Sequence, residues 1–264
     1  MSVLRSIGCA LALLSTSTLA LAAGLDNAPW DGLLQRHVRV LDGANATQVD
    51  YAGLRAEQGV LDDYLHATAA VSPAEFAAWS KAEQLAFLIN VYNASTVALV
   101  LSGEPQLASI KDLGSLFRSP WKQAFIKLLG ETRSLDDIEH TLIRGEQGYQ
   151  EPRVHFALNC ASIGCPALRA EAYSGAKLDA QLTDAQQHFL ADRSRNRLAG
   201  ERLQVSSIFK WYRPDFERNG QGLTDYLAGQ SAALGLTALQ AQQLRAKQIE
   251  IEFLDYDWRL NRTP

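Results

Sequence analysis

The apolar segment from Lys81 to Ser102 constrains the fold more than any other part of this 264-residue chain. Apolar side chains recur at helical spacing and cover much of the circumference of the expected helix. They are Leu85, Leu88, Ile89, Tyr92, Val97, Leu99 and Val100. A helix that is apolar on nearly every side has to be surrounded by other elements. The sequence therefore predicts a central, mostly buried helix, which ends at Gly103.

The rest of the chain reads as a helix-rich α+β protein with short antiparallel strands and hairpins. Helical spacing predicts helices over residues 30–41, 54–70, 134–144, 176–192, 223–228 and 237–246. Turn signals and alternation predict an extended piece at 49–54, hairpins at 121–135 and 196–205, and a strand at 248–253 that residues 256–260 continue or pair with. We find no Pro/Gly/Ser-rich linker, so we expect a single domain over residues 23–264.

The first 22 residues have the pattern of a secretory signal peptide. Arg5 precedes an apolar run from Ile7 to Leu21, and the run ends in Ala20-Leu21-Ala22. A basic start, a short apolar centre and small residues at the end favour cleavage near Ala22. We expect a soluble exported protein, periplasmic or secreted, with no membrane span in the mature chain.

Composition and motifs narrow the expected partners. The formal net charge is −4, so the chain has no overall attraction to nucleic acid or anionic lipid. There is no glycine-rich phosphate loop and no dinucleotide fingerprint, and we predict no cofactor. The partner we expect is an unknown envelope protein, a peptide or a small molecule.

The segment from Val154 to Pro166 carries most of the reactive side chains, among them the two cysteines that follow Cys9. If residues 154–159 are extended, His155 and Asn159 share one face. Cys160 then begins a turn or a helix, and amides at a helix start would lower the pKa of its thiol. Cys160 as nucleophile, His155 or His140 as base and Asn159 as orienting group would give a papain-like thiol enzyme.

A disulfide between Cys160 and Cys165 competes with this hypothesis. The two cysteines are five positions apart across a glycine-containing turn, and an exported chain meets an oxidising compartment. A disulfide would shape the turn and remove the nucleophile. A redox-active pair is a further alternative, although the spacing departs from C-x-x-C. Zinc bound by both cysteines with His140 and His155 lacks the usual ligand spacings, so we predict no metal.

Several other polar and aromatic residues are candidates for ligand binding. They are Asn90, Asn93, Glu139, Ser162, Trp211 and Tyr212. The two asparagines lie in the apolar central helix, where they either bond to neighbouring backbone or face a pocket. Glu139 fits a solvated helix surface as well as a site. The aromatic pair Trp211-Tyr212 and the later group Tyr256-Asp257-Trp258 fit core packing as well as a groove for peptide or sugar.

Five clusters together resemble the domain-of-unknown-function 547 family over residues 30–261. The clusters are Leu88–Asn93, Ser134–His140, His155–Pro166, Ile208–Tyr212 with Asp215-Phe216, and Phe253–Trp258. The resemblance implies no agreed activity. Some larger members of the family carry this domain beside redox-type or signalling modules.

Three hypotheses for function follow from the sequence. The first is a binding or structural domain of the cell envelope, with a His/Asn/Cys site shaped by the Cys160–Cys165 disulfide. The second is a thiol hydrolase or transferase acting on peptide-like substrates. The third is a thiol–disulfide redox partner.

Overall fold

The predicted central helix is α5 (Lys81–Gly103), and it is buried along nearly its whole length. The structure is a computed structural model that describes residues 24–103, 105–115, 118–218 and 220–264. By length and composition α5 could cross a membrane, but 89% of its most apolar window is buried inside the protein. The predicted signal peptide, residues 1–22, lies outside the described residues.

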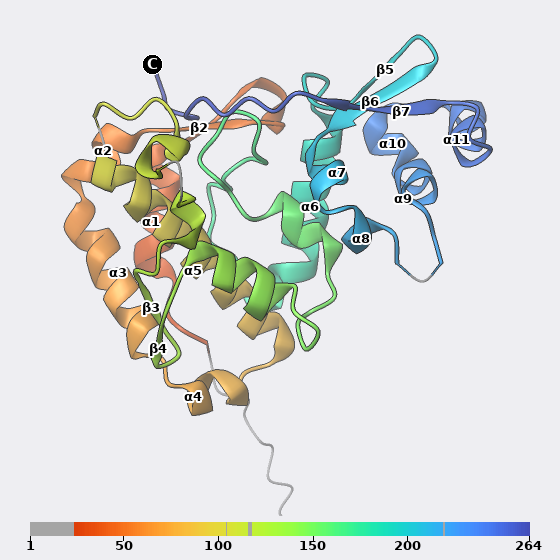
Figure 1. Ribbon diagram of the computed structural model, residues 1–264. Coiled ribbons are helices and arrows are strands. Elements are labelled where there is room, and N and C mark those ends of the chain that lie inside the picture. The colour runs from red at the N-terminus through yellow and green to blue at the C-terminus, as the bar shows by residue number, and fades with distance from the viewer. Residues whose placement is uncertain (1–23, 104, 116–117, 219) are drawn as a thin grey trace, which may run out of the picture.

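The first hydrophobic core forms around α5 (Figure 1). The helices around it are α1 (Ala28–His37), α2 (Tyr51–Ala56), α3 (Gln58–Ala70) and α4 (Pro73–Ala78). Two hairpins accompany them: β1 (Val38–Val40) with β2 (Thr47–Val49), and β3 (Ile126–Leu128) with β4 (Glu131–Arg133). Short 3-10 turns connect these elements, namely η1 (Asp42–Ala44), η2 (Ile110–Leu113) and η3 (Pro120–Lys122).

The second core lies between a three-stranded sheet and the C-terminal helices. Its elements are α6 (Leu178–Ala191), β5 (Arg197–Ala199), β6 (Arg202–Ser206), α7 (Ile208–Trp211), α8 (Arg213–Phe216), α9 (Leu223–Gly229), α10 (Ser231–Leu234), α11 (Ala238–Arg245) and β7 (Glu250–Leu254). The 3-10 turn η6 (Gly175–Lys177) precedes α6. Strand β6 pairs antiparallel with β5 and parallel with β7. The sequence predicts the β5–β6 hairpin but not the parallel pair.

The segment that carries the reactive side chains joins the two cores. Phe156 packs in the second core, while Val154, Ala157 and Leu158 on either side pack in the first. Residues 152–156 form a 3-10 helix, η5 (Pro152–Phe156), so the predicted extended conformation is wrong. Pro152 favours a helical first turn, and the Glu151 carboxylate caps the turn by accepting from the Arg153 amide.

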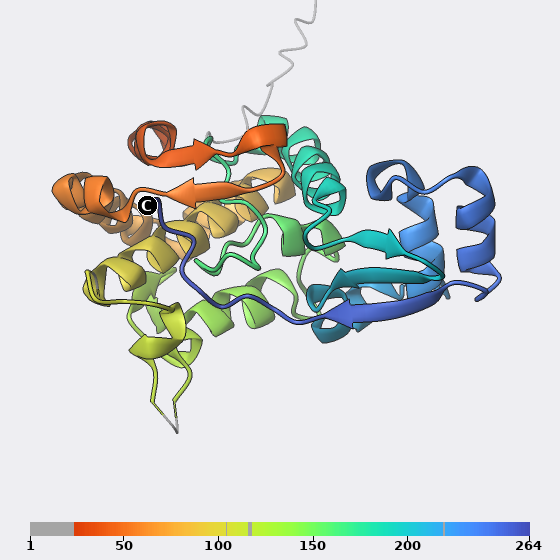
Figure 2. The same ribbon diagram turned by 90° about the horizontal axis from the view of Figure 1, so that it is seen from above.

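The chain after β7 crosses from the second core back to the first (Figures 1 and 2). Residues 255–258 are irregular, so the predicted continuation of the strand over 256–260 is wrong. Leu260 forms a bridge with Ser162 instead, and the Val49 amide donates to the Asn261 carbonyl at 2.8 Å. This crossing brings the C-terminal segment against the loop that holds Cys160.

Local chemistry also explains where other predicted elements begin and end. Helix α2 begins at Tyr51 because the Asp50 carboxylate accepts from the Gly53 amide, so residues 51–54 are helical rather than extended. The expected helix over 134–144 forms as a π-helix, η4 (Asp137–Ile143). Its start is fixed by reciprocal hydrogen bonds between Ser134 and Asp137, as the capping-box spacing predicts.

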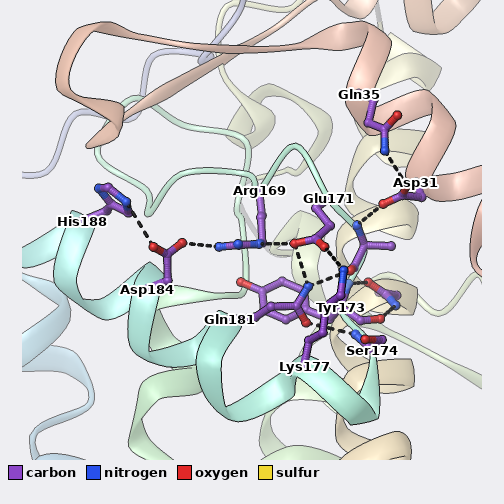
Figure 3. Close-up of polar contacts among 12 residues, drawn as sticks. Asp31, Gln35, Arg169, Glu171, Tyr173, Ser174, Lys177, Gln181, Asp184 and His188 are labelled. Atoms are coloured by element: carbon purple, nitrogen blue, oxygen red, sulfur yellow. Dashed lines mark hydrogen bonds and ion pairs between the residues drawn. The ribbon is translucent and has the colours of Figure 1, made fainter.

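A network of charged side chains holds the loop that follows Pro166 (Figure 3). Glu171 accepts from Arg169 at 3.1 Å and from Lys177 at 2.6 Å, and Arg169 also pairs with Asp184 on α6. The Ala172 amide donates to Asp31 on α1 at 2.8 Å. The loop is therefore tied to α1 and α6, which limits how far the preceding residues can move.

Candidate active site

A cavity of about 160 Å³ opens between the two cores. It is lined by six of the predicted site residues: Glu139, His140, His155, Cys160, Trp211 and Tyr212. Cys165, Tyr256 and Trp258 also line it, together with Tyr92, Trp121 and Asp136, which the sequence does not single out as site residues. The structure thus brings both predicted bases and the predicted nucleophile to one cavity.

His155 is buried and oriented by a carboxylate from α8. Its Nε2 lies 2.7 Å from Oδ2 of Asp215, and its ring stacks on Tyr212 with 3.9 Å between centroids. Because an ionised carboxylate accepts only, Nε2 carries the proton and Nδ1 keeps its lone pair. Nδ1 makes no hydrogen bond to any residue that the structure describes. Burial lowers the pKa of His155 despite the nearby Asp215, so the imidazole is neutral at pH 7.

Asp215 is buried and held by three basic side chains. Besides His155, the Arg144 Nε donates to it at 2.6 Å and Arg218 donates at 3.1 Å. Burial alone would raise the pKa of this carboxyl, but the hydrogen bonds from His155 and Arg144 outweigh it and hold the pKa well below its usual range. Asp215 therefore stays ionised and fixes one tautomer of His155.

The sulfur of Cys160 is surrounded by hydrogen-bond donors. It lies 3.2 Å from the Ser162 hydroxyl and 3.1 Å from the Tyr256 hydroxyl. Burial raises the pKa of the thiol, but hydrogen bonds from Cys165, Ser162 and Tyr256 outweigh it and lower the pKa to about 7. Of the two conformations expected after Cys160, the structure has a turn, at residues 163–164, and no helix. The Cys165 side chain, the Ser162 and Tyr256 hydroxyls and the Ser162 backbone therefore activate this thiol, with no helix start involved.

Cys160 and Cys165 are both free thiols, and the predicted disulfide is absent from this structure. The turn places Sγ of Cys165 at 2.7 Å from the backbone nitrogen of Cys160, where it accepts a hydrogen bond. The Cys165 side chain thus hydrogen-bonds to Cys160 without forming a disulfide with it. Burial raises the pKa of Cys165 well above its usual value, so the two thiols differ in acidity.

Asparagine side chains hold the loop around Cys160. Asn93 on α5 donates to the Ala157 carbonyl at 3.0 Å and accepts from the Asn159 amide at 2.9 Å. Asn159 in turn accepts from the Ala161 amide at 2.9 Å and donates to the Pro166 carbonyl at 2.7 Å. Ala161 has φ of 60°, a left-handed conformation that is costly for alanine. The amides hold the strained turn that presents Cys160.

Asn90, also on α5, makes a similar pair of hydrogen bonds to the backbone of Tyr173. Its amide donates to the Tyr173 carbonyl at 2.8 Å and accepts from the Tyr173 amide at 2.9 Å. Asn90, Asn93 and Asn159 are buried, and none of them lines the cavity. Their side chains bond to backbone, which is the structural alternative raised for Asn90 and Asn93. Ser162 touches the Cys160 sulfur without lining the cavity.

Glu139 is buried at the cavity wall, which differs from the solvated position favoured by the sequence pattern. Only 6% of the residue is exposed. It contacts the Tyr212 hydroxyl, whose pKa is raised by burial and by this carboxylate. His140, in contrast, is exposed at the rim and contacts Arg144 through Nδ1. The π-helical η4 turns these two neighbours to different environments.

Aromatic rings form the outer wall of the cavity. Trp211 contacts Tyr256 and Trp258, with ring centroids 4.9 and 5.8 Å apart, and Trp258 also contacts Trp121 at 5.7 Å. Trp211 is 45% exposed, so the wall reaches the surface. These rings therefore both pack together and line an opening, which combines the two alternatives stated for the aromatic pair.

Sequence reasoning missed Asp215 as a site residue, and it missed the contact of Tyr256 with the Cys160 sulfur. Both residues lie in clusters that carry the family resemblance, but nothing in their spacing shows that they meet His155 and Cys160. Within the described part of the chain, no group of three or more His, Cys, Asp or Glu residues is arranged to hold a metal ion.

Comparison with known proteins gives one match. Residues 76–190 match the family model described as "Protein of unknown function, DUF547". Cys160, His155, Glu139 and Asn93 lie within the matched residues, while Asp215 and Tyr256 lie beyond them. No curated protein and no solved structure matches the chain.

Proposed function

We propose that this protein, which belongs to the DUF547 family, is a thiol-dependent acyl hydrolase or transferase that acts on peptide-like substrates. Cys160 would be the nucleophile and His155 the general base. One observation carries the proposal: a free, acidified Cys160 thiol lines the same cavity as a neutral His155 oriented by a buried Asp215. The pattern of residues 1–22 supports export, so the reaction would take place in the cell envelope.

The acid–base properties of the pair suit this chemistry. A thiol pKa of about 7 gives a substantial thiolate fraction at neutral pH without making the sulfur a poor nucleophile. A neutral His155 with its lone pair on Nδ1 can accept a proton at the same pH. Asp215 supports the imidazolium that forms, as the carboxylate does in hydrolytic triads.

The first half of the proposed reaction transfers the acyl group of the substrate to Cys160. Within the cavity that both residues line, the Cys160 proton would move to Nδ1 of His155, and the sulfur would attack the acyl carbonyl to form an S–C bond. The carbonyl π pair moves to oxygen, where the hydroxyls of Tyr256 and Ser162 would stabilise the negative charge. When this intermediate collapses, the leaving alcohol or amine departs with the proton from His155.

A second acyl transfer completes the cycle. Water or an acceptor amine loses one proton to His155 and attacks the thioester carbonyl. The S–C bond then breaks, and the Cys160 sulfur recovers the proton from His155. Water gives a hydrolase and an amine gives a transferase.

The test uses 4-nitrophenyl acetate, with release of nitrophenolate and intact mass as readouts. Wild-type protein and Cys165→Ser should both turn over and carry a transient acetyl group on Cys160. Cys160→Ser should carry none, and His155→Gln should turn over at least about 100-fold more slowly. Unchanged turnover by His155→Gln would overturn the proposal.

The cysteine variants also separate acyl transfer from thiol–disulfide exchange. Acyl transfer needs Cys160 alone, whereas exchange through an internal pair needs both cysteines. The redox hypothesis would replace ours if both variants lost all activity and oxidised glutathione converted the wild type to a form lighter by two hydrogens. A protein whose Cys160 resists acetylation and alkylation would instead fit a binding domain.

A further inference from the structure

The cavity beside Cys160 has an acidic and aromatic lining, with no lysine or arginine among the described residues that form it. Two carboxyl groups line it, those of Asp136 and Glu139. The two histidines at its wall differ in setting, since His155 is held neutral by burial and His140 is exposed at the rim. A negatively charged substrate group would meet repulsion here, whereas a cationic group would meet attraction.

Glu139 is the strongest element of this lining. Only 6% of Glu139 is exposed, and its carboxylate contacts the Tyr212 hydroxyl. No ion pair of the described residues includes Glu139, and the nearby basic side chains of Arg144 and His155 pair with Asp215 instead. Asp136 differs, since it lies 3.9 Å from Nε2 of His140 and is half-buried. A buried carboxylate without a cationic partner is costly unless something else neutralises it.

The aromatic wall provides a second feature that favours cations. Tyr92, Tyr212, Tyr256, Trp211 and Trp258 all line the cavity, and the faces of such rings attract positive charge. Two rings of the wall already bind cations of the protein: Nζ of Lys111 lies 3.7 Å from the centroid of the Trp258 ring, and the Arg144 guanidinium lies 4.7 Å from that of Tyr212. Carboxylate and ring faces together are the chemistry by which proteins recognise ammonium groups.

We infer that this cavity recognises an alkylammonium group on the substrate, held by Glu139 and the aromatic wall, next to the acyl group that Cys160 attacks. The inference rests on the proposed function and names its substrate class: acyl compounds or peptides with a free amine near the reacting carbonyl. A cavity of about 160 Å³ accepts an aminoalkyl chain and not a folded polypeptide. The substrate therefore inserts a side chain or a chain end.

The first test compares two esters, one with a free, charged side-chain amine and one in which that amine is acetylated and neutral. They are the 4-nitrophenyl ester of Nα-acetyl-lysine and the same ester with its side-chain amine also acetylated. For the wild type, kcat/KM should favour the charged ester about tenfold, within the range of a cation–π contact supported by a carboxylate. Glu139→Gln should reduce the ratio to below about threefold. Glu201→Gln, a matched change at the exposed tip of the β5–β6 hairpin, should keep the wild-type ratio.

The second test measures binding without turnover. Equal concentrations of n-butylammonium and n-butanol are compared for protection of Cys160 from iodoacetamide. The ammonium ion should protect better in the wild type and lose that advantage in Glu139→Gln. Equal protection together with equal ester rates overturns the cation site and leaves the acyl chemistry standing. Selective protection without turnover of either ester supports the cation site and overturns the proposed function.

Discussion

The hydroxyl of Tyr256 lies 3.1 Å from the sulfur of Cys160, although the two residues are 96 positions apart. The contact exists because the chain after β7 crosses back over the Cys160 loop (Figure 2). Burial raises the pKa of Tyr256 well above its usual value, so its hydroxyl stays protonated and donates to the sulfur. The acidity of the thiol thus depends on a residue outside the matched family region.

Replacing Tyr256 by phenylalanine should make Cys160 less acidic. Removing a donor to a charged sulfur costs about 1.5–3 kcal/mol, which corresponds to a rise of about 1–2 in the thiol pKa. The measurement is the rate of iodoacetamide alkylation of Cys160 against pH, whose midpoint in the wild type should be about 7. Tyr149→Phe, which removes a hydroxyl bonded to Gln84, is the control and should leave the midpoint in place. An unshifted midpoint in Tyr256→Phe contradicts the assigned contact.

Gly164 allows the same contact by having no side chain. A Cβ there would lie 3.0 Å from the Asp257 backbone nitrogen and 3.0 Å from atoms of the Tyr256 ring. Gly164→Ala should therefore push the ring away and raise the alkylation midpoint of Cys160, as Tyr256→Phe does. Gly59→Ala on α3 meets nothing within 4 Å and serves as the control. If both alanine variants keep the wild-type midpoint, the packing against Gly164 does not position Tyr256.

Asp215→Asn should disable the base while preserving the hydrogen bond. An asparagine amide can donate to Nε2 of His155, which would leave the proton on Nδ1 and remove the lone pair from the side proposed to face the reaction. The expected loss in turnover of 4-nitrophenyl acetate is about 10³- to 10⁴-fold, by analogy with serine hydrolases. The pH dependence of alkylation of Cys160 should change far less. Turnover within tenfold of the wild type would argue against His155 as the base.

Stability should fall as the solution is acidified, in two separable steps. The folded pKa of His155 is lowered, so below about pH 6.5 the unfolded chain binds a proton that the folded chain resists. The folded pKa of Asp215 is also lowered, so its contribution is present above about pH 4 and is lost as pH falls further.

Urea denaturation between pH 8 and pH 3 measures both steps. His155→Gln should remove the upper step and keep the lower one, since Gln cannot titrate. An identical pH profile for this variant and the wild type would contradict the assigned His155 shift.

Asn93→Ala should weaken both the fold and the site. It leaves the Ala157 carbonyl and the Asn159 amide without their partner, at a cost of about 2–4 kcal/mol in unfolding free energy. Asn90→Ala breaks an equivalent pair of bonds to Tyr173 and should cost a similar amount. Only Asn93→Ala should also slow Cys160 acylation at a temperature where both variants are folded. Equal acylation rates would show that the Asn93 hydrogen bonds do not position the loop.

The sequence predicts those elements that are determined by residues close together in the chain. The apolar circumference of residues 81–102 predicts α5, and the Ser134–Asp137 spacing predicts where the next helix begins. Glu139 was expected in solvent because charged residues on a helix usually are, and periodicity could show neither that η4 is a π-helix nor that Glu139 lies in a cavity wall. The partners of His155 and Cys160 come from 60 and 96 residues away, and no local pattern encodes such distances.

The register of the parallel pair β6–β7 sets the relative positions of residues that line the cavity. It aligns Ser206 with Leu254, and the Ser207 hydroxyl fixes that alignment by donating to the Leu254 carbonyl at 2.6 Å. From this common edge, one strand leads to Trp211 and Tyr212 and the other leads to Tyr256. A slip of one residue would shift the end of β7, and with it the start of the segment that carries Tyr256, by about 3.3 Å. The reactivity of a thiol thus depends on strand alignment in a sheet that supplies no reacting group.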